Sequence, residues 1–458
     1  MAIHQVKWVR MSILIILCAT VLLTACVSEA ENDDRDGDVA LYADDVDLQA
    51  EKIRVWWDWL EFPYEELMGE YLKTAFGRER FEVNQFIGGI PLDNTGMTEG
   101  LYHKLRNEPT PDLIVFDSMY LSFFIESNYL EPMDIENFLV LDPNVLDELR
   151  TIAPDRQLYA LPYGENVSGL FYNKTIFDTM KVPYPTDGMT WDEVIELASQ
   201  VKSPGAWVSL YANDIGIVAS QLSMELYNKE TELVDFDTEA WAEWERFMDQ
   251  YLSHRQGEVW SGSMSEFSGG KIAMIAGSMF HELQHGFQDK AAQLRLFEVD
   301  WDVVRFPVFD AEQPVAPGRN MLLLGVPRMA ENKEDTYKLI RYLLSETVQF
   351  ENMRRGLLSL REDADTRLEE FGSALWTGKS TTFIDRSIPV GLYDSALDKL
   401  TIDRFVGVGH YENDPTNWWV VWDQDRIRNR LMEYRGERAT MILELQEKVR
   451  EYERFQAR

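Results

Sequence analysis

The chain has 458 residues, more than a single hydrophobic core usually serves, so two lobes are the natural expectation. It carries 79 acidic and 44 basic residues, and the resulting formal charge of −35 repels phosphate backbones and excludes nucleic acid as an expected partner. Its two cysteines, Cys18 and Cys26, both lie in the first segment, which excludes a disulfide framework or a thiolate zinc site in the rest of the chain.

The first 26 residues are typical of a secretory signal peptide. Lys7 and Arg10 precede an apolar stretch, residues 11–23, which is short for a membrane span. The stretch ends in Leu23-Thr24-Ala25-Cys26, which resembles the bacterial lipobox, whose cysteine is lipidated and becomes the mature N-terminus. We therefore expect a lipid anchor on Cys26. It would hold the protein on the extracellular face of the cell membrane, or on the periplasmic face where a second membrane is present.

Residues 27–50 are rich in aspartate and glutamate and have too little apolar content to fold alone. We expect them to form a disordered, self-repelling tether between the anchor and the folded body.

Strand and helix patterns alternate through the rest of the chain. Residues 111–116 form a continuous apolar run, which indicates a strand covered on both faces of a parallel sheet. Such alternation predicts an α/β fold. The other expected strands are residues 52–59, 80–86, 161–173, 271–276 and 301–308, and the expected helices are residues 64–76, 119–129, 191–201, 239–252, 332–356 and 423–458.

Three segments, taken in order, resemble the family 1 extracellular solute-binding proteins, a group that includes the maltose-binding proteins. The resemblance implies a periplasmic-binding-protein-like fold of type II, with two α/β lobes joined by crossing hinge strands and the ligand between them. The segments are Pro111–Asp117 with Asn128–Met133, Tyr159–Gly164 running into Gly169–Lys174, and Gly270–Ser278 followed by Val303–Pro307 and Leu324–Pro327.

Carried over to this chain, the resemblance places lobe one in residues 51–166 and 307–330 and lobe two in residues 167–306 and 331–458. It implies a monomeric substrate-binding component of an ABC importer, which delivers its ligand to permease subunits in the membrane. It also implies that the chain has no catalytic residues and needs no cofactor.

Ligands of open α/β sheets bind beyond the carboxyl ends of the strands. Aromatic rings suit the apolar faces of sugars, and carboxylates and amides suit their hydroxyls, so we predict a mono- or oligosaccharide bound by hinge closure. The candidate ligand-binding residues are Trp57, Trp59, Asp117, Tyr163, Glu165, Asn166, Asn213, Met279, Phe280, Trp418 and Trp419.

Several of these candidates have a structural alternative. The tryptophans suit core packing, Asp117 suits a helix N-cap and Asn213 suits a turn. Met279 stands where maltose binders carry a tryptophan, which weighs against a malto-oligosaccharide.

One motif points to a different function. His281-Glu282-Leu283-Gln284-His285 matches the pattern by which two histidines on one helix face bind zinc, with the glutamate as general base. The pattern fixes only three positions, and no third histidine follows at the metzincin spacing. A zinc metallopeptidase and a metal-binding receptor therefore remain alternatives, as do a receptor for a non-sugar solute and one that serves a sensor kinase.

Overall fold

The structure is a computed structural model, and all the residues that it describes lie in one unit, residues 40–458. The described residues are 46–57, 68–85, 103–134, 140–166, 168–201, 208–210, 218–228, 231, 233–254, 267, 269–270, 272–278, 299–354, 357–364, 367, 379–380, 384–390 and 424–456.

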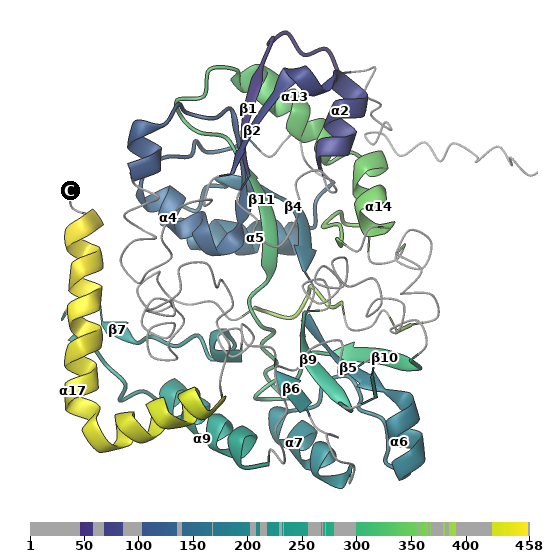
Figure 1. Cartoon of the computed structure of the whole chain (residues 1–458), viewed down its shortest axis with the longest axis vertical. Coiled ribbons are helices and arrows are strands. Elements are labelled where there is room, and N and C mark those ends of the chain that lie inside the picture. The colour runs from purple at the N-terminus through teal and green to yellow at the C-terminus, as the bar shows by residue number, and fades with distance from the viewer. Residues whose placement is uncertain are drawn as a thin grey trace, which may run out of the picture. The chain divides into compact units, whose positions relative to one another are not determined.

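The first of two larger sheets has the strand order β2-β1-β3-β11-β4 in the described part of the chain (Figure 1). Strands β1, β2 and β3 run parallel, and β11 is antiparallel to both of its neighbours. The central strand β3 is the predicted continuous apolar run, and all five of its residues are buried. The strands are β1 (Ile53–Trp57), β2 (Phe81–Gln85), β3 (Leu113–Asp117), β4 (Ala160–Asn166) and β11 (Asn320–Gly325).

Helices that accompany the first sheet contribute to one hydrophobic cluster, which we call the first core. Asp142 begins α5 by accepting a hydrogen bond from the backbone N–H of Asn144, and a proline follows at the first helical position. The contributing helices are α2 (Glu70–Phe76), η4 (Ser118–Tyr120), α4 (Leu121–Glu126), α5 (Pro143–Ile152), α13 (Lys333–Leu343) and α14 (Glu346–Arg354), and the short helix η3 (Arg78–Arg80) precedes β2.

Two features of the first core differ from the predicted domain organisation. The buried side chains of α13, including Leu339 and Leu343, lie in the first core, although the sequence analysis assigned residues 331–458 to the second lobe. Leu48 is also buried there, although residues 27–50 were predicted to be a disordered tether. The backbone N–H groups of Gln49 and Ala50 bind Asp335 of α13 over separations of 286 and 285 residues, which local sequence patterns do not reveal.

The second sheet has the strand order β10-β5-β9-β6. Strand β5 is antiparallel to β9 and β10, and β6 is parallel to β9. These strands are β5 (Ser168–Asn173), β6 (Val208–Leu210), β9 (Met274–Ser278) and β10 (Trp301–Arg305), and a two-stranded hairpin is formed by β7 (Tyr227–Asn228) and β8 (Leu233–Val234).

The helices of this second part of the chain carry most of its aromatic core. Thr190 caps α7 in a reciprocal capping box with Glu193, which satisfies backbone N–H groups at the start of the helix. The last helix, α17, is interrupted at Glu437, whose φ of −130° is not helical. The helices are α6 (Lys174–Met180), α7 (Trp191–Gln200), α9 (Glu239–His254) and α17 (Gln424–Gln456).

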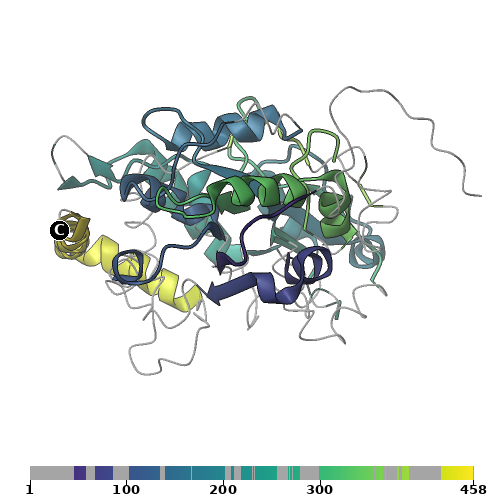
Figure 2. The ribbon, with the colours of Figure 1, turned by 90° about the horizontal axis from the view of Figure 1, so that it is seen from above.

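The chain passes from one sheet to the other in two places within the described residues. Strand β4 ends in the first sheet at Asn166, and β5 begins in the second sheet at Ser168. Strand β10 ends in the second sheet at Arg305, and after the connection 306–319 the chain enters the first sheet as β11. Figure 2 shows the same arrangement turned by 90°.

The described residues show neither a membrane-spanning helix nor a metal-binding cluster. In the residues that the structure describes, no helix combines the length and apolar character needed to cross a bilayer. Within the same residues, no group of three or more His, Cys, Asp or Glu side chains is arranged to hold a metal ion. His281 and His285 lie outside the described residues.

Candidate ligand site at the junction of the two sheets

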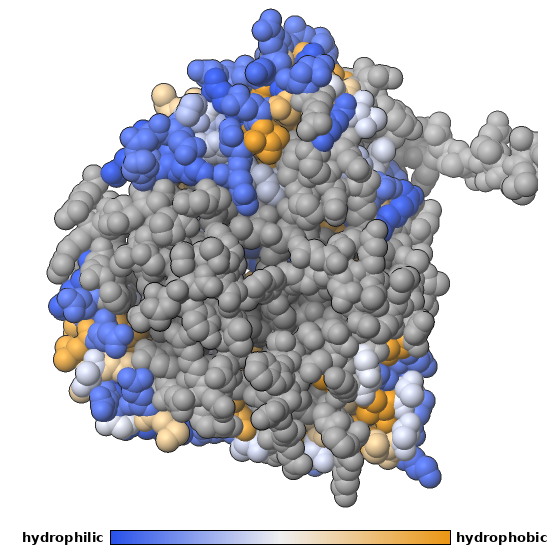
Figure 3. Space-filling model, in the orientation of Figure 1, coloured by the Kyte–Doolittle hydropathy of each residue, from blue (hydrophilic) through white to orange (hydrophobic). Residues whose placement is uncertain are grey.

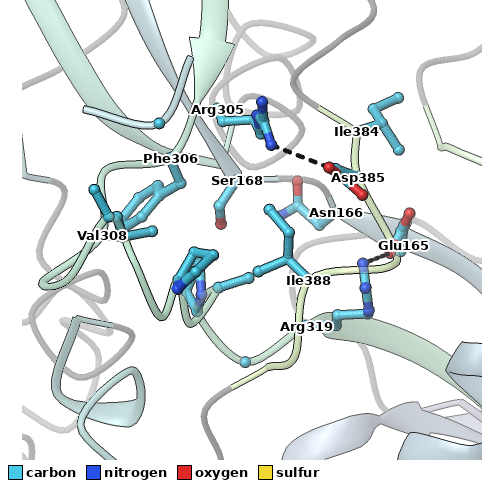
Figure 4. A pocket seen from close by; sticks show the side chains of 16 residues that line it. Glu165, Asn166, Ser168, Arg305, Phe306, Val308, Arg319, Ile384, Asp385 and Ile388 are labelled. Carbon is cyan, nitrogen blue, oxygen red and sulfur yellow. Dashed lines mark hydrogen bonds and ion pairs between the residues drawn. The ribbon is translucent and has the colours of Figure 1, made fainter. Parts of the chain in front are cut away.

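A cavity of about 240 Å³ lies where the chain passes between the sheets (Figure 4). Glu165 and Asn166 line it from the end of β4, Ser168 from the start of β5 and Arg305 from the end of β10. We call this cavity the junction pocket. Its other lining residues are Gly188, Phe306, Val308, Ala311, Pro314, Ala316, Pro317, Gly318, Arg319, Ile384, Asp385 and Ile388.

A chain of four charged side chains extends from one wall of the junction pocket into the protein. Glu165 accepts a hydrogen bond from Arg386 Nε at 3.0 Å and a second from Nη2 of the same guanidinium. On its other oxygen, Glu165 lies 3.5 Å from Arg319 Nη1, and Arg319 Nε donates to Glu148 Oε2 at 2.9 Å. All four side chains are at least 87% buried, so each charge depends on the pairing for its stability.

Glu148 is the member of this chain with a strongly altered acidity. Burial raises the pKa of its carboxyl to about 7, and the nearby negative charge of Glu165 adds to the rise. The guanidinium of Arg319 opposes the effect without cancelling it. The charge on Glu148 therefore changes close to neutral pH.

A second ion pair, between Arg305 and Asp385, also lines the pocket and is about one-third exposed. Arg305 Nη1 donates to Asp385 Oδ2 at 3.0 Å, and the backbone N–H of Arg305 donates to Asp187 Oδ1 at 2.8 Å. Asp385 and Arg386 are adjacent in sequence but bind different sheets: Asp385 binds the end of β10, and Arg386 binds Glu165 of β4. The segment 384–390 is therefore bonded to both sheets at the pocket.

The connection 306–319 is fixed to the second part of the chain by a buried amide. The side-chain N–H groups of Gln221 donate to the carbonyl oxygens of Pro307 and Val315, each at 2.8 Å. Its side-chain oxygen accepts a hydrogen bond from Trp191 Nε1 at 3.1 Å, and the ring of Trp191 meets Phe306 edge-on at 5.3 Å between centroids. Phe306 and Val308 give this wall of the pocket an apolar lining, and the hydrogen bonds of Gln221 hold it in place.

Comparison with known proteins assigns the chain to a family. The model of the bacterial extracellular solute-binding proteins matches residues 99–377, which is more than half of the chain. The chain belongs to this family. The predicted family membership is confirmed, and the protein is a solute-binding protein and not an enzyme.

Solved structures resemble this solute-binding protein in fold. The sugar-binding protein MalE from the phytopathogen Xanthomonas citri is 19% identical, with a TM-score of 0.58 over 89% of this chain and 97% of that one. Maltose-bound MalE3 from T. maritima is 16% identical, with a TM-score of 0.56 over 84% and 99%. UgpB from Mycobacterium tuberculosis in complex with glycerophosphocholine is 16% identical, with a TM-score of 0.57 over 85% and 99%. The predicted α/β periplasmic-binding-protein-like fold is confirmed.

Two of the predicted ligand-binding residues of the solute-binding protein, Glu165 and Asn166, line the junction pocket. Asp117 ends β3 and is 8% exposed; its neighbour Ser118 donates from Oγ to the carbonyl oxygen of Arg319, a lining residue. The antiparallel pairing of β3 with β11 therefore brings Asp117 close to the pocket without making it part of the lining.

Two other predicted ligand-binding residues lie in the first core of the solute-binding protein. Trp57 is 4% exposed and Tyr163 is fully buried, and neither lines the junction pocket. For Trp57 this is the core-packing alternative that the sequence left open. The other predicted residues lie outside the part of the chain that the structure describes: Cys26, Trp59, Asn213, Met279, Phe280, Trp418 and Trp419.

The arginines at the pocket of this solute-binding protein were not predicted from the sequence. Arg305, Arg319 and Arg386 each pair with a carboxylate at the pocket, but they are distant in sequence from one another and from Glu165. A signal that could have identified Arg305 is its position at the end of an apolar strand, two residues before Pro307, where a long charged side chain needs a partner.

Proposed function

We propose that this protein is the substrate-binding component of an ABC importer and that it binds a carbohydrate between its two lobes by hinge closure. The observation that carries the proposal is the position of the junction pocket, at the place where the chain passes between the sheets. Structures of similar fold support it: an ABC transporter solute-binding protein from Thermotoga lettingae is bound with α-D-tagatose, and MalE3 from T. maritima is bound with maltose.

The lobes in this proposal follow from the two sheets. The first lobe comprises the first sheet and the elements of the first core, including α13, and the second lobe comprises the second sheet and its helices. This keeps the predicted boundaries at residues 51–166, 307–330 and 167–306, and moves α13 and α14 from the second lobe to the first.

Closure follows from the two-sided lining of the pocket. Asn166 belongs to the first sheet, whereas Ser168 and Arg305 belong to the second. A ligand that contacts residues from both sheets has more contacts when the lobes are closed, so its binding favours that state.

The charges of the pocket favour a neutral ligand. Among the described lining residues, two are basic and two are acidic, so the net charge is 2 − 2 = 0. Arg305 is paired with Asp385, and Arg319 with Glu165 and Glu148, so neither guanidinium is left to neutralise a phosphate or a carboxylate. Apolar lining from Phe306, together with amide and hydroxyl groups, suits the C–H faces and hydroxyls of a sugar.

The proposal also includes the place of the protein in the cell. We propose that Cys26 carries the lipid anchor and that permease subunits of the importer receive the ligand. The signal-peptide pattern and the cysteine after Leu23-Thr24-Ala25 support the anchor. Replacing Cys26 with serine should abolish metabolic labelling with a palmitate analogue, and labelling that persists in this variant would contradict the assignment.

Thermal-shift and calorimetric titrations against a panel of sugars test the ligand class. The panel includes glucose, galactose, maltose and trehalose, and glycerol 3-phosphate and glycerophosphocholine represent charged solutes. We expect at least one neutral sugar to raise the melting temperature in proportion to the logarithm of its concentration, and the charged solutes to leave it unchanged. Stabilisation by the charged solutes alone would refute the carbohydrate assignment.

A matched pair of variants tests the site. Asn166→Ala removes an amide from the pocket, and we expect it to weaken sugar binding about 5- to 100-fold, the range for a lost hydrogen bond to a buried polar group. Asn228→Ala is the control, because Asn228 lies exposed on the β7–β8 hairpin and accepts a hydrogen bond from Thr231. Equal sugar affinities in the two variants would place the ligand outside the junction pocket.

A further inference from the structure

The segment 46–50, which precedes the first strand, lies against the first lobe. Leu48 is 6% exposed and belongs to the first core, and the half-buried Val46 and Ala50 pack against the same core. An isolated acidic tether would leave these apolar side chains in water, so their burial stabilises the docked position of the segment.

Polar contacts fix the backbone of this segment to residues far away in the sequence. The backbone N–H groups of Gln49 and Ala50 both donate to Asp335 Oδ2, at 2.7 and 2.5 Å. Arg80 Nη1 donates to the carbonyl oxygen of Leu48 at 2.7 Å. A carboxylate or a guanidinium takes part in each bond, so these hydrogen bonds are of the charge-assisted kind.

Asp335 is buried beside this segment. It lies in the first turn of α13 and is 5% exposed, and its second oxygen binds Lys338 Nζ at 3.3 Å. Lys338 in turn donates to the carbonyl oxygen of Asp47 at 3.3 Å. The neighbouring Glu334 has an 87% exposed side chain and pairs only with Lys338 among the contacts described.

We propose that Asp335, Arg80 and Lys338 form a receptor for the chain's own segment 46–50 and so fasten the predicted membrane tether to the first lobe. We call these three residues the N-terminal clasp. The link to a membrane rests on the proposed lipid anchor, whereas the docking of the segment does not.

The clasp shortens the predicted tether and determines which of the two lobes the tether holds. The tether becomes residues 27–45, which is 19 residues instead of the 24 of residues 27–50. Fully extended, these 19 residues reach at most about 65 Å. The first lobe is then the lobe held to the membrane, and the second lobe is the one that moves on closure.

The surroundings of the clasp agree with an attachment point at the surface of the protein. In Figure 1, α13 lies at the same end of the described structure as β1 and α2. In Figure 3, the described surface at this end is coloured mostly hydrophilic, with few apolar side chains.

Limited proteolysis of the full chain with endoproteinase Glu-C, in a buffer where it cuts after both aspartate and glutamate, tests the proposal. Cleavable residues occur on both sides of the proposed boundary: Asp44 and Asp45 before it, and Asp47 and Glu51 within or just after the segment. We expect the stable product of the wild type to begin at Asp45 or Val46. Cleavage after Asp47 at the rate of cleavage after Asp45 would overturn the proposal.

Two variants separate the clasp from a general effect of charge. Asp335→Ala should allow trimming to Leu48 or Lys52, whereas Glu334→Ala removes a carboxylate from the same turn and should leave the product unchanged. Identical products from the wild type and from Asp335→Ala would overturn the proposal.

Amide hydrogen exchange is a second test of the docked segment, and it does not depend on protease access. In the wild type, the amides of Gln49 and Ala50 should be protected, and in Asp335→Ala they should exchange at least about ten-fold faster. The amides of β3 should keep their protection, which shows that the variant is folded. Unprotected amides at Gln49 and Ala50 in the wild type would overturn the clasp and leave the solute-binding proposal intact.

Discussion

Replacing Glu148 with glutamine tests the buried chain of charges beside the junction pocket. Burial raises the pKa of Glu148 from 4.5 to about 7, and at about 1.4 kcal/mol per pH unit this corresponds to on the order of 3 kcal/mol. Because the pKa is higher in the folded state than in the unfolded one, the folded state binds the proton more tightly. The resulting stability is fully present below pH 4.5 and is lost as the pH rises through about 7.

Urea denaturation of the wild type and of Glu148→Gln, at pH 5 and at pH 8, measures this effect. Glutamine does not titrate, so the free energy of unfolding of the wild type should fall relative to the variant by on the order of 3 kcal/mol between the two pH values. Glu334→Gln is the control, because its side chain is 87% exposed and its substitution should not change the pH profile. If the wild type and the Glu148→Gln variant showed the same pH dependence of stability, the raised pKa assigned to the buried Glu148 carboxyl would be refuted.

Three further substitutions test the packing that positions the pocket, each by urea denaturation. A side chain at Gly164 would place its Cβ 2.4 Å from Leu357 Cγ in the first core, so Gly164→Ala should destabilise the protein by about 1–3 kcal/mol, and a neutral result would show that Leu357 moves freely. Asp112 is 1% exposed and accepts from the backbone N–H of Asn332 at 3.0 Å, so Asp112→Ala should cost about 2–5 kcal/mol; a loss below 1 kcal/mol would contradict this contact. Gln221→Leu leaves an indole N–H and two carbonyl oxygens without their partner and should lower the free energy of unfolding by about 2–4 kcal/mol. An unchanged free energy of unfolding would mean that water replaces these hydrogen bonds.

The alternating architecture was predictable because it depends on local patterns. The continuous apolar run at residues 111–116 became the buried strand β3, and the helix expected at residues 191–201 became α7. Those patterns depend on neighbouring residues, which the sequence displays directly. The family resemblance then supplied the arrangement of the elements, which periodicity alone does not fix.

The contacts between distant segments were not predictable in the same way. Asp335 binds the backbone of Gln49, and Arg386 binds Glu165, over separations of 286 and 221 residues. The sequence offers each carboxylate many possible hydrogen-bond donors, and only the fold determines which of them it binds. For the same reason, Tyr163 was predicted at the ligand site but lies in the first core, two residues before Glu165 at the pocket.

Small-angle scattering tests the central claim, the closure of two lobes on a neutral sugar, most directly. The sugar from the panel that gives the largest thermal shift is added at saturation to the wild type and to Asn166→Ala. We predict that the radius of gyration of the wild type decreases on addition of the sugar, and that the same concentration has a smaller effect on the variant. A sugar that binds without changing the radius of gyration would contradict closure.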